Sequence, residues 1–203
     1  NKTAYKELML DIDSYTGSKT NVVFTEHHLS HAAYSYYTSP YNNAIIVSVD
    51  GVGEWETTTI YEGTKNKLKK LDSIKFPHSL GMFYSAFTAF LGFKPNEGEY
   101  KMMGLAPYGD SSRYIDKFDS IISGKEGNFK LNMYLFTYEY SDTHMFNEKL
   151  GMLLELPNRL PEEPLTQDHK DLAASVQAIY EKYFFNLLEK AFSLSSSRNL
   201  CLS

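Results

Sequence analysis

Two histidines and an aspartate near the start of the chain form a pattern that suits a metal ion. His27 and His31 are four residues apart in a segment expected to be helical, residues 25–37, and this spacing puts both side chains on one face. Asp50 follows the apolar run 44–49, which predicts a buried strand, and ligands bind at the carboxyl ends of strands in open α/β sheets. Two imidazoles and a carboxylate suit iron(II), zinc or manganese and leave positions open for a substrate.

The residues around this pattern suggest further contacts. Gly51 and Gly53 are expected to let the backbone turn tightly and to leave room for an oxygen-rich ligand such as a phosphate. His28 points away from its two neighbours on the helix, which predicts a hydrogen bond behind the metal ligands or a contact to substrate. The alternative is that the histidines form hydrogen bonds inside a packed core, as single histidines usually do.

Composition limits the class of protein. The 203 residues suffice for one full-sized domain, and a hydrophobic fraction of 42% is typical of a globular chain. A net charge of -5 argues against nucleic acid as the main partner. The single cysteine, Cys201, excludes an internal disulfide and agrees with a cytoplasmic location. No apolar run is long enough to cross a bilayer, so no membrane partner is expected.

The pattern of apolar residues predicts an α/β fold with a mixed sheet, a hairpin and flanking helices. The predicted elements are a helix over 4–12, a strand over 22–24, the histidine helix, strands over 44–49, 57–61 and 68–76, a helix capped by Ser79, a short helix over 111–123, a turn and strand within 124–132, a strand or extended segment over 134–140, and a helix over 166–194. Residues 96–109 are expected to be a loop that lines a site, and 141–164 a plain loop.

Two features concern the carboxyl-terminal part of the chain. Thr166 is the expected cap of the long helix, and His169 at the third helical position makes the capping box incomplete. The apolar sequence NLCLS at 199–203 predicts a strand that continues further, so the chain is expected to be a fragment of a longer protein.

Four segments follow one another in an order and spacing that resemble a known family. They are EHHLSHAAYSYY at 26–37, VSVDGVGE at 47–54, PHSLGMFYSAFTAFLGF at 77–93 and EGEYKMMGLAPYG at 97–109. Together they resemble the O-carbamoyltransferases of the NodU and cephalosporin/tobramycin carbamoyltransferase type, strongly over 22–109 and more loosely to residue 203. The resemblance implies a catalytic domain of the actin-like ATPase superfamily (ASKHA, RNase H-like), related to the tRNA threonylcarbamoyl transferase TsaD. Residues 1–203 would be an amino-terminal fragment of this domain.

The resemblance also implies an activity. A carboxyl-terminal YrdC-like domain, absent from these 203 residues, would make carbamoyl-adenylate from carbamoyl phosphate and ATP. The TsaD-like domain would then pass the carbamoyl group to a hydroxyl of a small molecule or sugar. His27, His31 and Asp50 match the family's metal ligands, with iron(II) as the expected ion. A further aspartate ligand and the Gly-Gly nucleotide loop would lie beyond Ser203, so the fragment alone is expected to be inactive.

Other roles follow from the same resemblance. Gly51 and Gly53 would let a phosphate of the ATP-derived cofactor approach the backbone. Lys101 would neutralise a phosphate, with Glu99 orienting it; the alternative is a solvated pair of charges. His28 would act as a base or hold the acceptor.

Three other functions remain open at this stage. The first is transfer of threonylcarbamoyl to tRNA, against which the acidic balance argues. The second is metal-dependent hydrolysis, although HHLSH lacks the glutamate of the HExxH peptidases. The third is a sugar-binding module without catalysis. For any acceptor, the expected aromatic contacts near the histidines are Tyr34, Tyr36, Tyr37 and Tyr41.

Overall fold

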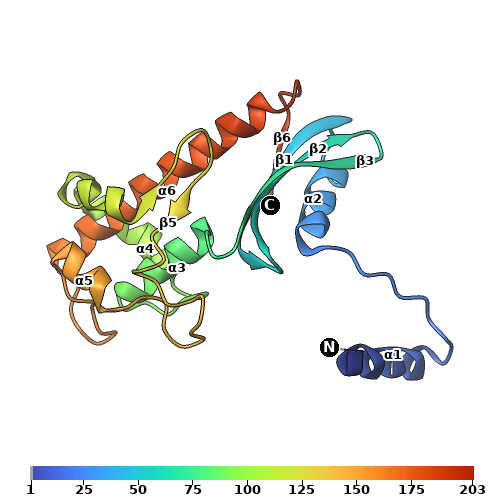
Figure 1. Cartoon of the computed structure of the whole chain (residues 1–203), viewed down its shortest axis with the longest axis horizontal. Helices are drawn as coiled ribbons and strands as arrows, with labels where there is room; N and C mark the ends of the chain where they lie inside the picture. Colours follow the sequence, from blue (N-terminus) through green and yellow to red (C-terminus); the bar gives the residue numbers. More distant parts are fainter. Residues whose placement is uncertain (1) are drawn as a thin grey trace.

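A four-stranded mixed sheet carries helices on both of its faces in the computed structural model, which describes residues 2–203 (Figure 1). The strand order is β3-β2-β1-β6, in which β1, β2 and β3 are antiparallel and β6 lies parallel to β1. The strands are β1 (Asn43–Gly53), β2 (Glu56–Thr64), β3 (Lys67–Lys75) and β6 (Leu200–Leu202), with β4 (Ile122–Ser123) and β5 (Lys130–Leu131) forming a separate pair. The predicted α/β class, mixed sheet and hairpin are confirmed.

Apart from α1 (Lys2–Thr16), which Figure 1 shows away from the sheet, the helices lie in two groups around it. They are α2 (His27–Tyr37), α3 (Leu80–Phe90), α4 (Glu99–Leu105), α5 (Glu148–Leu154) and α6 (Gln167–Ser193), with short 3-10 turns at Ala106–Tyr108, Ser111–Arg113 and Ile115–Ser120. In Figure 1, α2 covers one face of the sheet. Helices α3, α4 and α5 gather beside α6 on the other side of the sheet. No helix within residues 2–203 is both long enough and apolar enough to span a membrane.

Residues 44–47 of β1 form a continuous apolar run because both faces of the strand are covered there. Ala44 and Ile46 belong to the cluster beneath α2, whereas Ile45 and Val47 pack with Leu187 and its neighbours on α6. All four β1 side chains are buried. A strand covered on one face only would alternate between apolar and polar residues, so the continuous run follows from this position.

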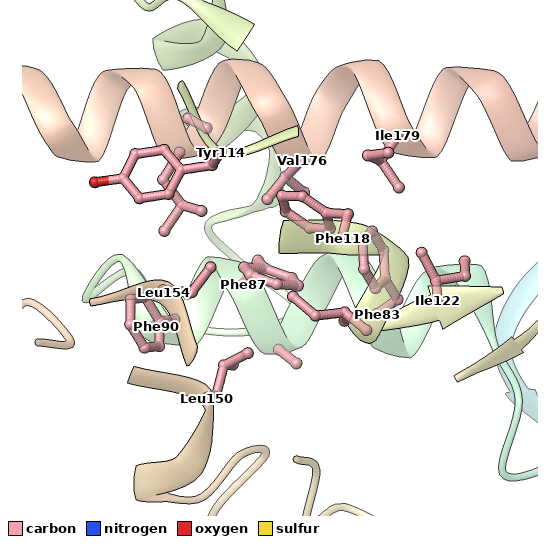
Figure 2. Close-up of a cluster of buried hydrophobic side chains, with 14 of the residues drawn as sticks. Phe83, Phe87, Phe90, Tyr114, Phe118, Ile122, Leu150, Leu154, Val176 and Ile179 are labelled. Carbon is pink, nitrogen blue, oxygen red and sulfur yellow. The ribbon is translucent and has the colours of Figure 1, made fainter. Parts of the chain in front are cut away.

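A second and larger core lies between α3 and α6 (Figure 2). Phe83 and Phe87 stack edge to face with ring centroids 5.0 Å apart, and Phe118 lies 5.3 Å from Phe87. The start of α3 is stabilised by Ser79, whose Oγ accepts a hydrogen bond from the backbone N–H of Met82. The predicted α3 and its cap are confirmed.

Helix α6 contributes both to the core between α3 and α6 and to the apolar cluster on the face of the sheet. Its first half packs in the core between α3 and α6, and its last turns cover the sheet. The predicted helix over 166–194 is confirmed, but the expectation of an incomplete capping box is wrong. His169 Nδ1 accepts a hydrogen bond from the backbone N–H of Thr166 at 3.0 Å, because an imidazole nitrogen can replace the glutamate carboxylate at this position.

Two predicted strands are wrong. Residues 22–24 are not part of a strand, and Val23 is 78% exposed. Residues 134–140 do not pair continuously with a neighbouring strand. Phe136 forms one isolated β-bridge, and the Tyr138 hydroxyl donates a hydrogen bond to the Pro77 carbonyl. Strand propensity alone does not supply the neighbouring strand that a ladder requires.

Two segments predicted as loops contain helices. Residues 99–105 form α4, which buries Met102 and Leu105 at a spacing of three residues. Residues 148–154 form α5, whose cap is Asn147 and which buries Leu150 in the core. Both helices have only seven residues, and helices this short are stabilised mainly by packing against the rest of the protein.

Candidate metal centre

The structure brings His27, His31 and Asp50 together at the end of the sheet. His27 Nε2 lies 2.7 Å from Asp50 Oδ2 and 3.0 Å from His31 Nε2. His31 Nε2 lies 3.8 Å from the same carboxylate oxygen. These three ligand atoms therefore surround one point in space, as a tridentate site requires.

The distances between the three ligand atoms, 2.7, 3.0 and 3.8 Å, lie close to those around a divalent metal, with one slightly shorter and one slightly longer than expected. Metal–nitrogen and metal–oxygen bonds of about 2.1 Å place neighbouring ligand atoms about 3.0–3.5 Å apart in octahedral or tetrahedral geometry. The side chains of His27, His31 and Asp50 are 40%, 45% and 35% exposed, which leaves one side of the cluster open. Two facing Nε2 atoms cannot both carry a proton, so a shared cation suits them well.

Asp50 is held as a charged carboxylate. Burial by itself raises the pKa of Asp50, but hydrogen bonds from His27 and from the Gly51 N–H outweigh it and keep the pKa below its usual value. The Gly51 N–H donates to Asp50 Oδ1 at 2.6 Å, which leaves Oδ2 directed at the histidines. Ser79 also holds this end of β1, because its hydroxyl donates to the carbonyl of Gly51 at 2.7 Å.

Gly53 has a different structural role from the one expected. The strand β1 continues through Gly53, and the tight turn falls at Glu54, whose φ is 58°. The prediction of a turn at Gly51 and Gly53 is therefore wrong. A Cβ atom at position 53 would lie 2.3 Å from Cδ2 of His27, so the histidine ring occupies the space that a side chain would need. A phosphate contact at these glycines stays a prediction.

We expect Gly53→Ala to impair metal binding more than folding. The added methyl group would press mainly on the partly exposed ring of His27 and, at 2.9 Å, less closely on the buried ring of His28, so the larger displacement falls on a proposed metal ligand. Affinity for zinc, measured by competition with a chromophoric chelator, should fall on the order of tenfold to 100-fold, as for other changes that misorient a ligand. Gly51→Ala is the matched control, because its Cβ would meet Met82 Sδ at an ordinary 3.7 Å. Equal affinity in the two variants would contradict this account.

His28 fastens α2 to the sheet. Its side chain is buried, with Nε2 2.9 Å from the Glu56 carbonyl and Nδ1 3.2 Å from the Thr59 hydroxyl. Burial lowers the pKa of His28, so the ring is neutral, donates from Nε2 and accepts at Nδ1. Both nitrogens have partners in the protein, and this geometry favours the predicted supporting hydrogen bond over the predicted role as a base.

Lys70 on β3 was not singled out from the sequence, yet it holds the start of α2. Its Nζ donates to Glu26, which precedes the helix, at 3.1 Å and to Glu56 at 2.8 Å. Partial burial alone would lower the pKa of Lys70, but the hydrogen bonds to the two carboxylates raise it. A lysine in a polar strand has no local pattern that identifies such a contact, because its partners are distant in the chain.

Glu99 and Lys101 do not form the expected pair. Glu99 begins α4, and its Oε1 accepts hydrogen bonds from the Ser85 hydroxyl at 2.6 Å and from the Asn96 N–H at 2.9 Å. Lys101 is exposed, and its Nζ lies 6.0 Å from the centre of the Tyr100 ring. A phosphate contact by Lys101 stays a prediction.

A cavity of about 1030 Å³ borders the two histidines. Tyr34 and Tyr41 line it together with His27 and His31, so two of the four expected tyrosines lie near the cluster. Tyr36 is instead buried, and its hydroxyl donates to the Asn42 carbonyl.

Comparison with known proteins places this geometry in a family. The family described as carbamoyltransferase N-terminus matches residues 2–203. An uncharacterized protein of Synechocystis sp. is 44% identical over 205 residues, which cover all of this chain and 33% of that protein. The nodulation protein NolNO of Sinorhizobium fredii is 29% identical over 189 residues, 91% of this chain and 25% of the relative. The nodulation protein NolO of Bradyrhizobium diazoefficiens is 28% identical over 180 residues, which cover 87% of this chain and 30% of that protein.

The chain spans a third or less of the length of these relatives. The family match nevertheless extends over all residues that the structure describes, including the histidine helix and the strand that ends at Asp50. The chain belongs to the carbamoyltransferase N-terminus family.

Proposed function

We propose that the full-length protein transfers a carbamoyl group to a hydroxyl of a small molecule or sugar. The observation that carries this proposal is the convergence of His27, His31 and Asp50 at one end of the sheet, in a chain of the carbamoyltransferase N-terminus family. The donor would be carbamoyl-adenylate, made from carbamoyl phosphate and ATP. These substrates are proposed for the whole protein, of which the present chain is one part.

The proposed domain layout follows from the same resemblance. Residues 1–203 would form part of an amino-terminal TsaD-like domain of the actin-like ATPase superfamily, and the mixed sheet with helices on both faces supports this assignment. A YrdC-like domain of the same full-length chain would supply the carbamoyl-adenylate. We propose that the reaction takes place in the cytoplasm.

The residues of this chain would act mainly by binding and orientation. His27, His31 and Asp50 would hold a divalent ion, for which we propose iron(II); bound there, such an ion supplies Lewis acidity. Hydrogen bonds from His28 to the sheet and ion pairs of Lys70 with Glu26 and Glu56 would keep α2 in place, and Asp50 stays charged. Precise orientation of reacting groups is a large part of enzymatic rate acceleration.

The proposed transfer exchanges one acyl–oxygen bond for another. The acceptor hydroxyl forms a bond to the carbamoyl carbon, and the bond between this carbon and the phosphate oxygen breaks. AMP leaves with the electron pair, and the hydroxyl proton passes to solvent. Lys101, exposed on α4, is proposed to neutralise a phosphate of the nucleotide.

The test uses the full-length protein with ATP, carbamoyl phosphate and iron(II). Mass spectrometry follows carbamoyl-adenylate and AMP in the wild type and in His27→Ala. We expect the adenylate to accumulate in the variant and to be consumed by the wild type, because the variant lacks a metal ligand needed only for transfer. Absence of adenylate in the metal-loaded wild type would overturn the proposal and favour metal-dependent hydrolysis.

A further inference from the structure

Helix α3 begins in direct contact with the backbone that carries Asp50. A Cβ atom at Gly81, the second residue of the helix, would lie 2.7 Å from the carbonyl oxygen of Asp50 and 2.8 Å from the backbone nitrogen of Gly51. Non-bonded atoms do not approach so closely, so a side chain at this position would push against backbone atoms. Glycine, which has no Cβ, lets the helix pack this tightly on the peptide bond between Asp50 and Gly51.

The residue before the helix holds the same end of β1. The Ser79 hydroxyl donates to the Gly51 carbonyl at 2.7 Å and lies 3.1 Å from the Asp50 carbonyl oxygen. The hydroxyl oxygen also accepts a hydrogen bond from the N–H of Met82, and the side chain is fully buried. Ser79 therefore joins the first turn of α3 to the end of β1, in addition to capping the helix.

The peptide bond between Asp50 and Gly51 sets the orientation of the Asp50 carboxylate. The Gly51 N–H donates to Asp50 Oδ1 at 2.6 Å, and the other carboxylate oxygen, Oδ2, lies 2.7 Å from His27 Nε2. The nitrogen of this N–H group is also one of the atoms nearest to Gly81. Metal ligands need to lie within about 0.2 Å of their usual distances, so a shift of this peptide bond would misplace Oδ2 relative to the histidines.

The first turn of α3 is held firmly in place. Phe83 and Phe87 are fully buried in the core between α3 and α6. On β2, the Thr57 hydroxyl donates at 2.6 Å to the carbonyl of His78, which directly precedes the cap of α3. Close-packed interiors transmit strain instead of absorbing it. A methyl group added to the second residue of the helix would therefore shift the end of β1.

We propose that Ser79 and Gly81 are positioning residues for the candidate metal centre. They hold the end of β1 so that the Asp50 carboxylate faces the two histidines. The inference rests on the proposed function, because it concerns the orientation of one ligand of the metal ion proposed to assist carbamoyl transfer. It accounts for a glycine inside a helix, where glycine lowers helical stability relative to alanine.

The first test compares Gly81→Ala with Gly104→Ala in the full-length protein. Both glycines lie in helices, but a Cβ atom at Gly104 would meet nothing within 4 Å. Affinity for zinc is measured by competition with a chromophoric chelator. We expect Gly81→Ala to lose about tenfold to 100-fold in affinity, as for other changes that misorient a ligand, and Gly104→Ala to bind within about twofold of the wild type.

The second test separates positioning from helix capping. Ser79→Ala removes the hydroxyl that both caps α3 and ties it to β1. Asn147→Ala removes only a cap, because the Asn147 side chain accepts the Lys149 N–H at the start of α5. Loss of a cap should lower the stability of both metal-free variants in denaturant unfolding. We expect Ser79→Ala alone to lose zinc affinity as well, by at least about tenfold.

Each outcome decides the inference. Equal zinc affinity in Gly81→Ala and Gly104→Ala would overturn the role of Gly81. Equal affinity in Ser79→Ala and Asn147→Ala would overturn the role of Ser79, and this comparison decides alone if Gly81→Ala does not fold. No zinc binding by the wild type, or unchanged affinity in His31→Ala, would overturn the metal centre and this inference with it. Absence of carbamoyl-adenylate in the transfer assay would overturn carbamoyl transfer alone, because zinc affinity is measured without substrate.

Discussion

His31→Ala is expected to lower the affinity for iron(II) or zinc on the order of 100-fold or more, because it removes one of three ligands. The metal-free variant should unfold with nearly the wild-type free energy, since changes at exposed positions usually alter stability by no more than about 0.5 kcal/mol. The side chain of His31 is 45% exposed, and its Nε2 lies 3.0 Å from His27 Nε2 and 3.8 Å from Asp50 Oδ2. Competition titrations measure the affinity, and denaturant unfolding of the metal-free protein measures the stability.

The control for this variant is His144→Ala. His144 is an exposed histidine in the segment before α5, outside the cluster of His27, His31 and Asp50. Its loss should leave the metal content unchanged. Metal content that is equally unchanged in His31→Ala would eliminate the proposed site, and a large loss of stability in the metal-free variant would show that His31 acts in folding.

Phe87→Ala is expected to lower the free energy of unfolding by about 3–5 kcal/mol. Its ring is fully buried between α3 and α6, where it contacts Phe83, Phe90 and Phe118 (Figure 2). Truncation removes buried apolar surface and leaves a cavity among rigid aromatic neighbours that cannot close around it. Urea unfolding followed by circular dichroism measures the change.

Phe185→Ala gives the matched comparison, because Phe185 on α6 is 58% exposed. The same atoms are removed there without opening a buried cavity, so stability should change by less than about 1 kcal/mol. Similar losses of stability in Phe87→Ala and Phe185→Ala would contradict this prediction, because they would mean that burial in the α3–α6 core adds nothing to the contribution of a phenylalanine ring.

The sequence predicted correctly those helices and strands that have a clear local pattern, such as apolar periodicity, a helix cap or a turn. Helix α6 has a long apolar periodicity, α3 has both periodicity and a serine cap, and the strands β1 to β3 are separated by clear turns. The spacing of His27 and His31 predicted a shared face, and the structure has their Nε2 atoms 3.0 Å apart. Local geometry is sufficient for such predictions because residues four apart on a helix are always neighbours.

The features that the sequence did not reveal depend on contacts between distant segments. Seven-residue α4 and α5 have too few turns to show periodicity, and their apolar residues find partners only in the assembled core. Gly53 was interpreted as room for a phosphate, whereas the nearest atoms belong to the ring of His27, 26 positions earlier in the chain. The contacts of Lys70 with Glu26 and Glu56 also join separate elements.

The uneven spacing of contacts along the chain has a consequence for biosynthesis. The side chains of the candidate metal centre all lie within residues 27–50, whereas β6 pairs with β1 from far along the chain, and the Ser48 and Ser203 hydroxyls meet at 2.9 Å across 155 positions. Pairings between such distant segments form slowly, because a long loop must close first. During translation, α2 and β1 to β3 therefore emerge and can assemble well before their parallel neighbour exists.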